Sequence, residues 1–260
     1  MLVENKVAVV SGIGPGMGRD ISLALAREGA NIVLVGRTRS KLDAVAAEVE
    51  SLGKRALPLI CDVTDEAACE EVVEGAIADL GGIDILVNNA YDGGDASTFM
   101  DADFDRWRKT MDVNLFGSLA MTRACVPALE ASGDGRVVMV NTMSIQRIQQ
   151  RWGAYAASKG ALATATKTLA LELGPKGIRV NAIHPGYIYG DSVEWYFNHQ
   201  AEKRGISFQE VYDEVADETC LGYLPTSAEI AGTVVFFASP LSRAVTGQMI
   251  GVNAGHWFNG

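Results

Sequence analysis

A tyrosine and a lysine stand four residues apart in the run YAASK, where Tyr155 precedes Lys159. In an α-helix this spacing places both side chains on one face, about one turn apart. A phenol ionises with a pKa of about 10, so it is a poor base near neutral pH unless a neighbouring cation favours the phenolate. The pair therefore has the chemistry of a proton donor and acceptor, although Tyr and Lys also meet by chance on many helices.

Polar side chains follow two apolar runs that are typical of buried strands. The run VVMV leads into NTMS with Thr142 and Ser144, and the run ILV leads into NNA with Asn89 and Ala90. A helical segment between these two runs carries Asn114. Ligands of open α/β sheets collect at the carboxyl ends of the strands, so a hydroxyl at this place is positioned to contact a substrate.

A glycine-rich turn lies between the first apolar run, VAVV, and the first helical pattern. Glycines let backbone amides approach a pyrophosphate, and a new helix N-terminus supplies unpaired N–H groups and a positive dipole. The spacing is S-G-x-x-x-G-x-G rather than G-x-G-x-x-G, but the strand-turn-helix context is the one that such a motif requires. The turn predicts a dinucleotide site held by Gly12, Gly14, Gly16, Met17 and Gly18.

The end of the second predicted strand indicates which nicotinamide cofactor is bound. An acidic residue there accepts hydrogen bonds from the ribose 2'-hydroxyl, whereas an arginine accommodates a 2'-phosphate. This chain has Arg37 and Arg39 and no carboxylate in that place, so NADP(H) is favoured and NAD(H) stays possible. The alternative is that both arginines are solvated charges. After the third strand, Asp62 and Val63 are placed to contact the adenine.

Short β-branched apolar runs alternate with stretches of 3.6-residue periodicity, which is the pattern of repeated βαβ units. We therefore expect one α/β domain over residues 1–260, a Rossmann-type doubly wound fold whose seven-stranded parallel sheet has helices on both faces. The predicted strands are Val7–Val10, Asn31–Val35, Ala56–Cys61, Ile83–Val87, Arg136–Asn141, Ile178–His184 and Gln248–Val252. The predicted helices are Gly16–Glu28, Ser40–Leu52, Glu66–Leu80, Asp103–Ala131, Gly153–Leu173 and Ser227–Ala238, and an aromatic-bearing insertion at about 191–224 is predicted to form a small helical lid.

Composition excludes several classes of function. With 32 acidic and 22 basic residues the formal charge is -10, so the chain has no general attraction for nucleic acid. The four cysteines show no framework spacing, and no apolar run reaches the roughly 18 residues of a membrane span. The histidines are dispersed, which predicts no metal site. We expect a cytoplasmic protein with no membrane partner.

Together these motifs resemble the short-chain dehydrogenase/reductase family over nearly the whole chain, to the ending VTGQMIGVNAG. The resemblance implies that Tyr155 is the general acid or base, that Lys159 lowers its pKa and holds the nicotinamide ribose, and that Ser144 bonds the substrate oxygen. It further implies that Asn114 supports a water-linked proton relay and that the protein is a homotetramer. The remaining residues that it assigns to the cofactor are Asn89 and Ala90 on the adenosine side and Pro185, Gly186 and Ile188 at the nicotinamide.

Some positions depart from the family pattern. Ser144 lies two residues closer to Tyr155 than is usual, and Thr142 has the usual spacing, so Thr142 is an alternative for contacting the substrate oxygen. Tyr91 replaces the glycine that usually follows NNA, which would crowd the cofactor or shape the substrate side. Gly190 stands where a threonine often helps to hold the nicotinamide.

The predicted function is NAD(P)(H)-dependent interconversion of a secondary alcohol and a ketone. Aromatic residues of the insertion, among them Trp195 and Tyr196, suit a bulky or ring-bearing apolar substrate if they line the site, or they only pack the lid onto the core. One alternative is a non-enzymatic protein that senses nicotinamide or serves as a scaffold. Another is a lyase or epimerase, which the short chain without a separate substrate domain disfavours.

Overall fold

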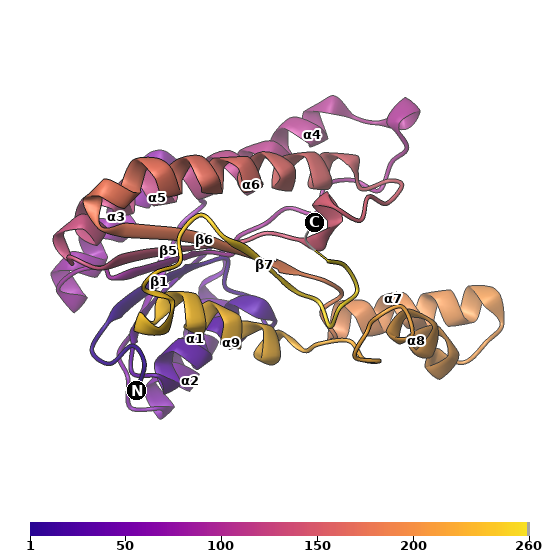
Figure 1. Ribbon diagram of the computed structural model, residues 1–260, viewed down its shortest axis with the longest axis horizontal. Helices are drawn as coiled ribbons and strands as arrows, with labels where there is room; N and C mark the ends of the chain where they lie inside the picture. Colours follow the sequence, from indigo (N-terminus) through magenta and orange to yellow (C-terminus); the bar gives the residue numbers. More distant parts are fainter. Residues whose placement is uncertain (259–260) are drawn as a thin grey trace.

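The computed structural model describes residues 1–258 and contains a sheet of seven parallel strands (Figure 1). The strand order is β3-β2-β1-β4-β5-β6-β7, so the chain winds outward in both directions from β1 and β4. The predicted Rossmann-type sheet is confirmed. Its strands are β1 (Val7–Ser11), β2 (Asn31–Gly36), β3 (Ala56–Ile60), β4 (Ile85–Asn88), β5 (Gly135–Val140), β6 (Ile178–Pro185) and β7 (Met249–Val252).

Helices cover both faces of the sheet, which is why the central strands β1 and β5 are buried along their whole length. The helices α1 (Met17–Arg27), α2 (Arg39–Ser51) and α9 (Ser227–Ala238) lie on one face, below the sheet in Figure 1. The other face carries α3 (Glu66–Leu80), α4 (Phe104–Met111), α5 (Ser118–Ala131) and α6 (Gly153–Leu173). No helix within residues 1–258 is long and apolar enough to cross a membrane.

Most of the predicted strand and helix ends agree with the structure to within two residues, and short 3-10 turns fill several connections. Ile83 was predicted to open the fourth strand but lies in the turn before β4, after two glycines with left-handed φ angles. It is nevertheless buried, so an apolar pattern alone cannot separate a core turn residue from a strand residue. The 3-10 turns are η1 (Phe99–Asp101), η3 (Met143–Ile145), η4 (Gly174–Lys176) and η5 (Pro240–Ser242).

The long helix predicted over Asp103–Ala131 contains an unpredicted π-helical turn, η2 (Asp112–Gly117), between α4 and α5. Gly117 ends this turn against the chain after β3, since a Cβ there would lie 2.6 Å from a methyl group of Val63. A single wide turn leaves the apolar periodicity of a helix almost unchanged, so the sequence pattern does not reveal it. The turn carries Asn114 and thereby shapes the candidate site.

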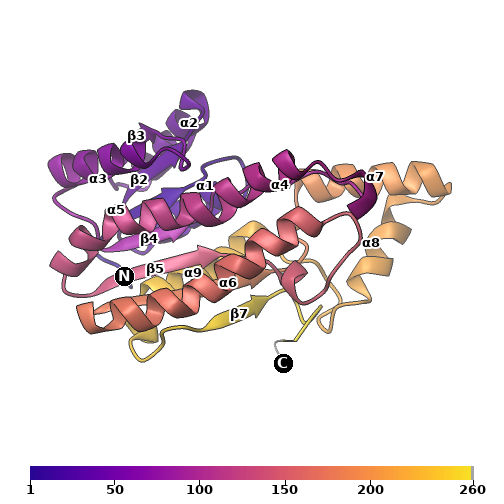
Figure 2. The ribbon, with the colours of Figure 1, turned by 90° about the horizontal axis from the view of Figure 1, so that it is seen from above.

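Two helices occupy the predicted insertion, α7 (Asp191–Arg204) and α8 (Phe208–Ala216), and project beyond the sheet (Figure 2). They pack around a small apolar cluster of their own in which Phe197 is fully buried. Ser207 and Glu210 form a reciprocal capping box that fixes the start of α8. The insertion is therefore a small helical unit with its own apolar cluster, and it lies beside the carboxyl ends of the strands.

Candidate active site

The turn between β1 and α1 is held against the end of β4. Gly12 has a left-handed φ of 81°, and a Cβ there would lie 2.5 Å from the backbone of Ala90. A Cβ on Gly18 would lie 2.4 Å from the carbonyl oxygen of Gly12, and the Asn89 side-chain amide donates to that same oxygen at 2.8 Å. Packing alone thus requires glycine at positions 12 and 18.

Gly14 and Gly16 are different, because a Cβ on either would meet no atom of the described chain within 4 Å. Gly16 is the N-cap of α1, and among the described residues no side chain caps this helix. Met17 is its first residue, so the first backbone amides of α1 are open to a ligand. An uncapped helix N-terminus beside open space fits a pyrophosphate, so a dinucleotide cofactor fits this cradle.

The residues predicted to read the adenosine end lie close together after β2 and β3. The guanidinium of Arg37 is 72% exposed and lies 3.9 Å from the carboxylate of Asp62. Asp62 in turn accepts hydrogen bonds from the amide and the hydroxyl of Thr64, and the amide bond lowers the pKa of this carboxyl. Val63 is buried. Arg37 is thus held only by a long, exposed ion pair, which is weak.

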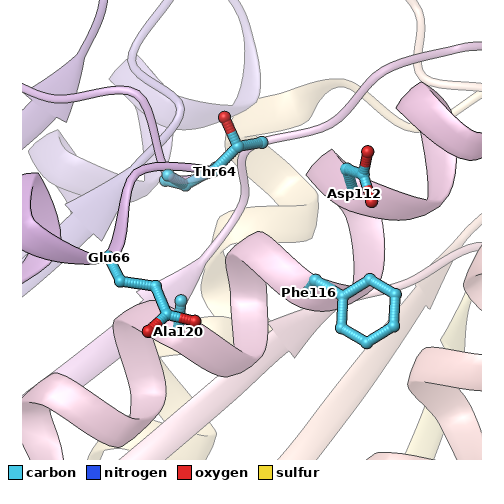
Figure 3. Close-up of a pocket in the computed structure, with 6 residues that line it drawn as sticks. Thr64, Glu66, Asp112, Phe116 and Ala120 are labelled. Atoms are coloured by element: carbon cyan, nitrogen blue, oxygen red, sulfur yellow. The ribbon is translucent and has the colours of Figure 1, made fainter.

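A surface hollow of about 320 Å³ adjoins Val63, with Thr64 and Glu66 on one side and Asp112 and Phe116 on the other (Figure 3). Its lining comes from the loop after β3, the start of α3, η2 and α5. Neither member of the proton-handling pair contributes to it. This hollow is therefore separate from the site of the predicted chemistry.

Tyr155 and Lys159 lie in the first two turns of α6, at the carboxyl ends of the strands. The start of α6 is fixed by Gly153, where a Cβ would lie 2.8 Å from the ring of Trp107. The phenol of Tyr155 is half-buried, whereas Lys159 is 2% exposed and its ammonium donates to the carbonyl oxygen of Val140 at 2.7 Å. Helix spacing and β5 together set the position of the lysine.

Burial controls the protonation of both groups. It raises the pKa of Tyr155 to about 12, although the Thr142 hydroxyl within hydrogen-bonding reach of the phenol acts to lower it. Loss of solvation is the largest cause of this rise and outweighs the hydrogen bond with Thr142. Burial also lowers the pKa of Lys159 to about 7. Near neutral pH the phenol therefore carries its proton, and the lysine is close to its midpoint.

Two hydroxyls follow β5 and are bonded to each other. The hydroxyl of Thr142 donates to Ser144 Oγ at 3.2 Å and accepts from the Ser144 amide at 3.1 Å. Thr142 is buried and reaches the phenol of Tyr155, while Ser144 is half-buried. The structure thus places Thr142, which has the usual family spacing to Tyr155, against the phenol. Ser144 is bonded to Thr142 and lies one hydrogen bond further from the phenol.

Asn114 is fully buried in η2, and its side chain ties together two segments. Its oxygen accepts from the amide of Asp92 at 2.7 Å, and its nitrogen donates to the carbonyl oxygen of Asp92 and to Ser158 Oγ, both at 2.9 Å. The carboxylate of Asp92 also accepts from Arg106 and Thr110. Asn114 therefore fixes the loop after β4, a contact that sequence reasoning missed.

The residues predicted to contact the nicotinamide follow the end of β6. Pro185 is its last residue, and a Cβ on Gly186 would lie 2.8 Å from the side chain of Asn253. The amide of Gly186 donates to Val252 at the end of β7, and Ile188 packs against the core that holds α1. This segment is thus fixed at the same sheet edge as Tyr155.

An ion-pair cluster joins the loop after η3 to the insertion and the C-terminal segment. Glu218 accepts from Arg147 and from His256 Nε2, the latter at 2.9 Å. The ring of His256 stacks on Tyr187 with centroids 5.7 Å apart. Arg147, which precedes Tyr155 in the sequence, is therefore neutralised within the protein.

Two aromatic side chains flank Tyr155 edge-on. The ring centroid of Tyr91 lies 6.4 Å from that of Tyr155, and that of Trp152 lies 5.6 Å from it. Sequence reasoning noted Tyr91 as a departure but did not assign Trp152. Its position three residues before Tyr155, at the start of the helix, is the signal that places the two side chains on one face.

Comparisons with known proteins agree with this fold. A family model described as enoyl-(acyl carrier protein) reductase matches residues 12–256. The short-chain reductase protein NovJ of Streptomyces niveus is 35% identical over 252 residues, which cover 97% of this chain and 94% of that protein. The structure of NAD+-bound xylitol dehydrogenase has a TM-score of 0.90 at 31% identity, covering 97% of this chain and 99% of that one. L-sorbose reductase of Gluconobacter frateurii, complexed with NADPH and L-sorbose, has a TM-score of 0.92 at 31% identity and covers 98% of both chains.

Proposed function

Because the chain belongs to the short-chain dehydrogenase/reductase family, it is an oxidoreductase that acts on CH–OH groups, and we propose that it interconverts a secondary alcohol and a ketone by hydride transfer. The observation that carries this proposal is the position of Tyr155 and Lys159 at the sheet edge where the uncapped start of α1 also lies. Proton handling and cofactor binding thus meet at one edge of the sheet.

The proposed chemistry divides between cofactor and protein. A bound nicotinamide supplies or accepts the hydride at the substrate carbon. In the reductive direction Tyr155, protonated near neutral pH, donates its proton to the ketone oxygen as negative charge develops there. Lys159 would hold the nicotinamide ribose and, with a pKa of about 7, would be able to return a proton towards the phenol. Asn114 supports the water-linked relay behind them.

The substrate oxygen also needs a hydroxyl donor, and we assign it to the bonded pair Thr142 and Ser144. The family pattern favours Ser144, while the contact with Tyr155 favours Thr142. Either hydroxyl donates to the substrate oxygen without a change in its own charge. Single variants of the two residues separate their roles.

NADP(H) is the proposed cofactor, with NAD(H) as the alternative. Arg37 supports it, since an exposed guanidinium in a weak ion pair is free to turn towards a 2'-phosphate. The neighbouring structures bear on the nicotinamide only, because one is complexed with NADPH and another with NAD+. Asp62 and Val63 would contact the adenine of either cofactor.

We propose a bulky or ring-bearing apolar substrate covered by the insertion. Phe197 only packs inside the insertion, but Trp195 is 69% exposed and Tyr196 is 43% exposed. These exposed rings on the insertion are available to contact an apolar ligand. The relatives named for xylitol and L-sorbose make a polyol and a ketohexose the competing substrates to test.

Assembly and location are proposals of the same kind. The proposed homotetramer is built through the long helical segments Asp103–Ala131 and Gly153–Leu173 with the C-terminal segment. Phe116 in η2 and Leu171 in α6, which are 56% and 79% exposed, support it. A cytoplasmic location is supported by four cysteines that are all free thiols. Light scattering and cell fractionation test the two proposals.

The decisive experiment for the function is a screen of alcohols and ketones, followed by absorbance of the reduced cofactor, with wild type and Tyr155→Phe. Loss of turnover with retained cofactor binding in the variant is expected. Unchanged turnover would remove the phenol from the mechanism. A wild type that binds cofactor but turns over no member of the screen would favour the sensor or scaffold alternative.

A further inference from the structure

We propose that Tyr91 and Trp152 form an aromatic clamp for a ring attached to the reacting carbon, so that the preferred substrates are aryl ketones and the matching benzylic alcohols. The inference rests on the proposed function, since it places the reacting oxygen at Tyr155. It extends that function by assigning the binding of the substrate ring to Tyr91 and Trp152, which flank Tyr155, rather than to the aromatic residues of the insertion.

The geometry of three rings carries the argument. Tyr91 and Trp152 both stand edge-on to Tyr155, each at an interplanar angle of 70°. Tyr91 and Trp152 remain 66% and 43% exposed, so neither ring is buried in the core. A ketone whose oxygen meets the Tyr155 hydroxyl must place its substituent within one or two bonds of that point. A substituent in this position lies within reach of both flanking rings, whose favourable centroid separations are about 4.5–7 Å.

Both rings are carried on fixed backbone. The residue after Tyr91 is Asp92, whose amide and carbonyl both bond Asn114 and whose carboxylate bonds Thr110. Trp152 is the N-cap of α6, and its carbonyl oxygen accepts from the Ala156 amide at 2.8 Å. A preorganised pair of rings loses little conformational entropy when a ligand binds.

The charges next to the rings are neutralised within the protein. Asp92 forms an ion pair with Arg106 at 2.9 Å, and Arg147 is paired with Glu218. The surface offered beside Tyr155 is therefore aromatic and has no strong field from these groups. Such a surface favours a flat, uncharged ring over a polyhydroxylated chain, which would leave hydroxyls without partners.

The test compares two ketones of the same carbon skeleton size, acetophenone and cyclohexyl methyl ketone. For wild type, kcat/KM for acetophenone is expected to exceed that for the saturated ketone by about tenfold, since each aromatic pair is worth roughly two- to tenfold. Tyr91→Leu and Trp152→Leu should each lower this ratio at least twofold, and the double variant should bring it near one. Tyr91→Phe, which keeps the ring, should retain it.

Phe116→Leu serves as the matched control, because it removes an exposed ring of η2 that lines the hollow beside Val63, to which Tyr155 does not contribute. A wild-type ratio near one, or a ratio that stays high in the double variant, would overturn the clamp. Failure of the proposed function looks different, because neither ketone nor alcohol would then turn over. In that case ligand-observed NMR of the same two ketones still decides, since equal acetophenone binding by wild type and the double variant contradicts the clamp.

Discussion

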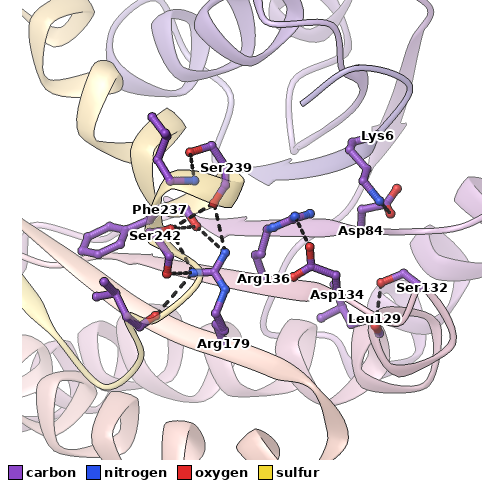
Figure 4. A network of polar contacts seen from close by, with 12 residues as sticks. Lys6, Asp84, Leu129, Ser132, Asp134, Arg136, Arg179, Phe237, Ser239 and Ser242 are labelled. Carbon is purple, nitrogen blue, oxygen red and sulfur yellow. Dashed lines mark hydrogen bonds and ion pairs between the residues drawn. The ribbon is translucent and has the colours of Figure 1, made fainter. Parts of the chain in front are cut away.

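Both ends of the sheet hold buried or half-buried cations, but the cations at the two ends differ in their hydrogen-bond partners. At the amino ends of β5 and β6, Arg179 donates to backbone oxygens of Phe237, Ser239, Ser242 and Val245 (Figure 4). Burial, and then the nearby charge of Arg136, lower the pKa of Arg179. Arg136 pairs with Asp134, while its Nε and Nη1 have no partner within the described chain.

At the carboxyl ends, Lys159 is as buried as Arg136 but has a single acceptor among residues 1–258, the carbonyl oxygen of Val140. An ammonium has three donors, so two of them remain available to a ligand. The backbone acceptors around Arg179 join β6 to the end of α9 and to the segment from η5 to Val245, so this cation stabilises the fold. Lys159 contributes only one hydrogen bond to the fold and keeps two donors for a ligand. A buried charge with unused donors is typical of a functional site.

The largest effect is expected for Lys159→Met, which should lower kcat/KM by about 10²–10⁴-fold, the usual contribution of acid–base machinery. The variant should nevertheless be at least as stable as wild type. Burial depresses the lysine pKa from 10.5 to about 7, so the unfolded chain binds more protons between these values. Wild-type stability should therefore rise with pH through this window relative to the variant. Thermal unfolding at pH 6 and pH 9 measures this.

A variant that is less stable than wild type at pH 6 would contradict this reasoning, because Lys159 would then act as a structural cation. The difference in melting temperature between variant and wild type should shrink from pH 6 to pH 9. A constant difference would show that the lysine does not titrate in this range.

The opposite outcome is expected at the amino end. Arg179→Met removes the donor for several backbone oxygens and should cost about 3 kcal/mol of unfolding free energy, within the range for buried groups left without partners. The kcat of the remaining folded enzyme should change less than twofold. Urea unfolding measures the loss. A normal stability together with a large fall in kcat would reverse the comparison between the two ends.

The parts of the molecule that follow from local pattern were accessible from the sequence. Alternating apolar runs predicted the parallel sheet, and the four-residue spacing predicted the shared helix face of Tyr155 and Lys159. The rise of the Tyr155 pKa on burial was not predicted, because burial depends on tertiary packing that no motif encodes. The π turn at Asn114 was missed for another reason, because one wide turn leaves the apolar helix pattern almost unchanged and its effect appears only in contacts with Asp92.

Hydroxyl groups allow a similar comparison of the two ends. Thr142→Val removes the hydroxyl that reaches the phenol and should lower kcat about 10²-fold, as for loss of one donor at a reacting oxygen. Ser242→Ala at the amino end removes a hydroxyl that bonds Phe237 and Arg179, and should cost about 1 kcal/mol without affecting kcat. Steady-state kinetics and urea unfolding of both variants test this.

Ser144→Ala decides between the two hydroxyls of the site. If Thr142 is the donor to the substrate oxygen, Ser144→Ala should be several-fold milder than Thr142→Val. If Ser144→Ala is the more damaging, the family pattern with its shortened loop describes the site correctly, and Thr142 only positions Ser144 and Tyr155.

The exposed cation Arg37 is the last charge in the comparison of the two sheet ends, and its substitution should have the smallest effect of those considered. Arg37 lies at the carboxyl end with one long ion pair to Asp62, so its charge serves neither packing nor proton transfer. Arg37→Asp should weaken NADPH binding about tenfold and leave NADH binding unchanged or tighter, because a carboxylate repels a 2'-phosphate and accepts from a 2'-hydroxyl. Fluorescence titration of both cofactors measures the ratio of their Kd values. If the wild type binds NADH more tightly than NADPH, Arg37 is a solvated charge. The exposed position of its guanidinium at this sheet edge would then not indicate which cofactor is bound.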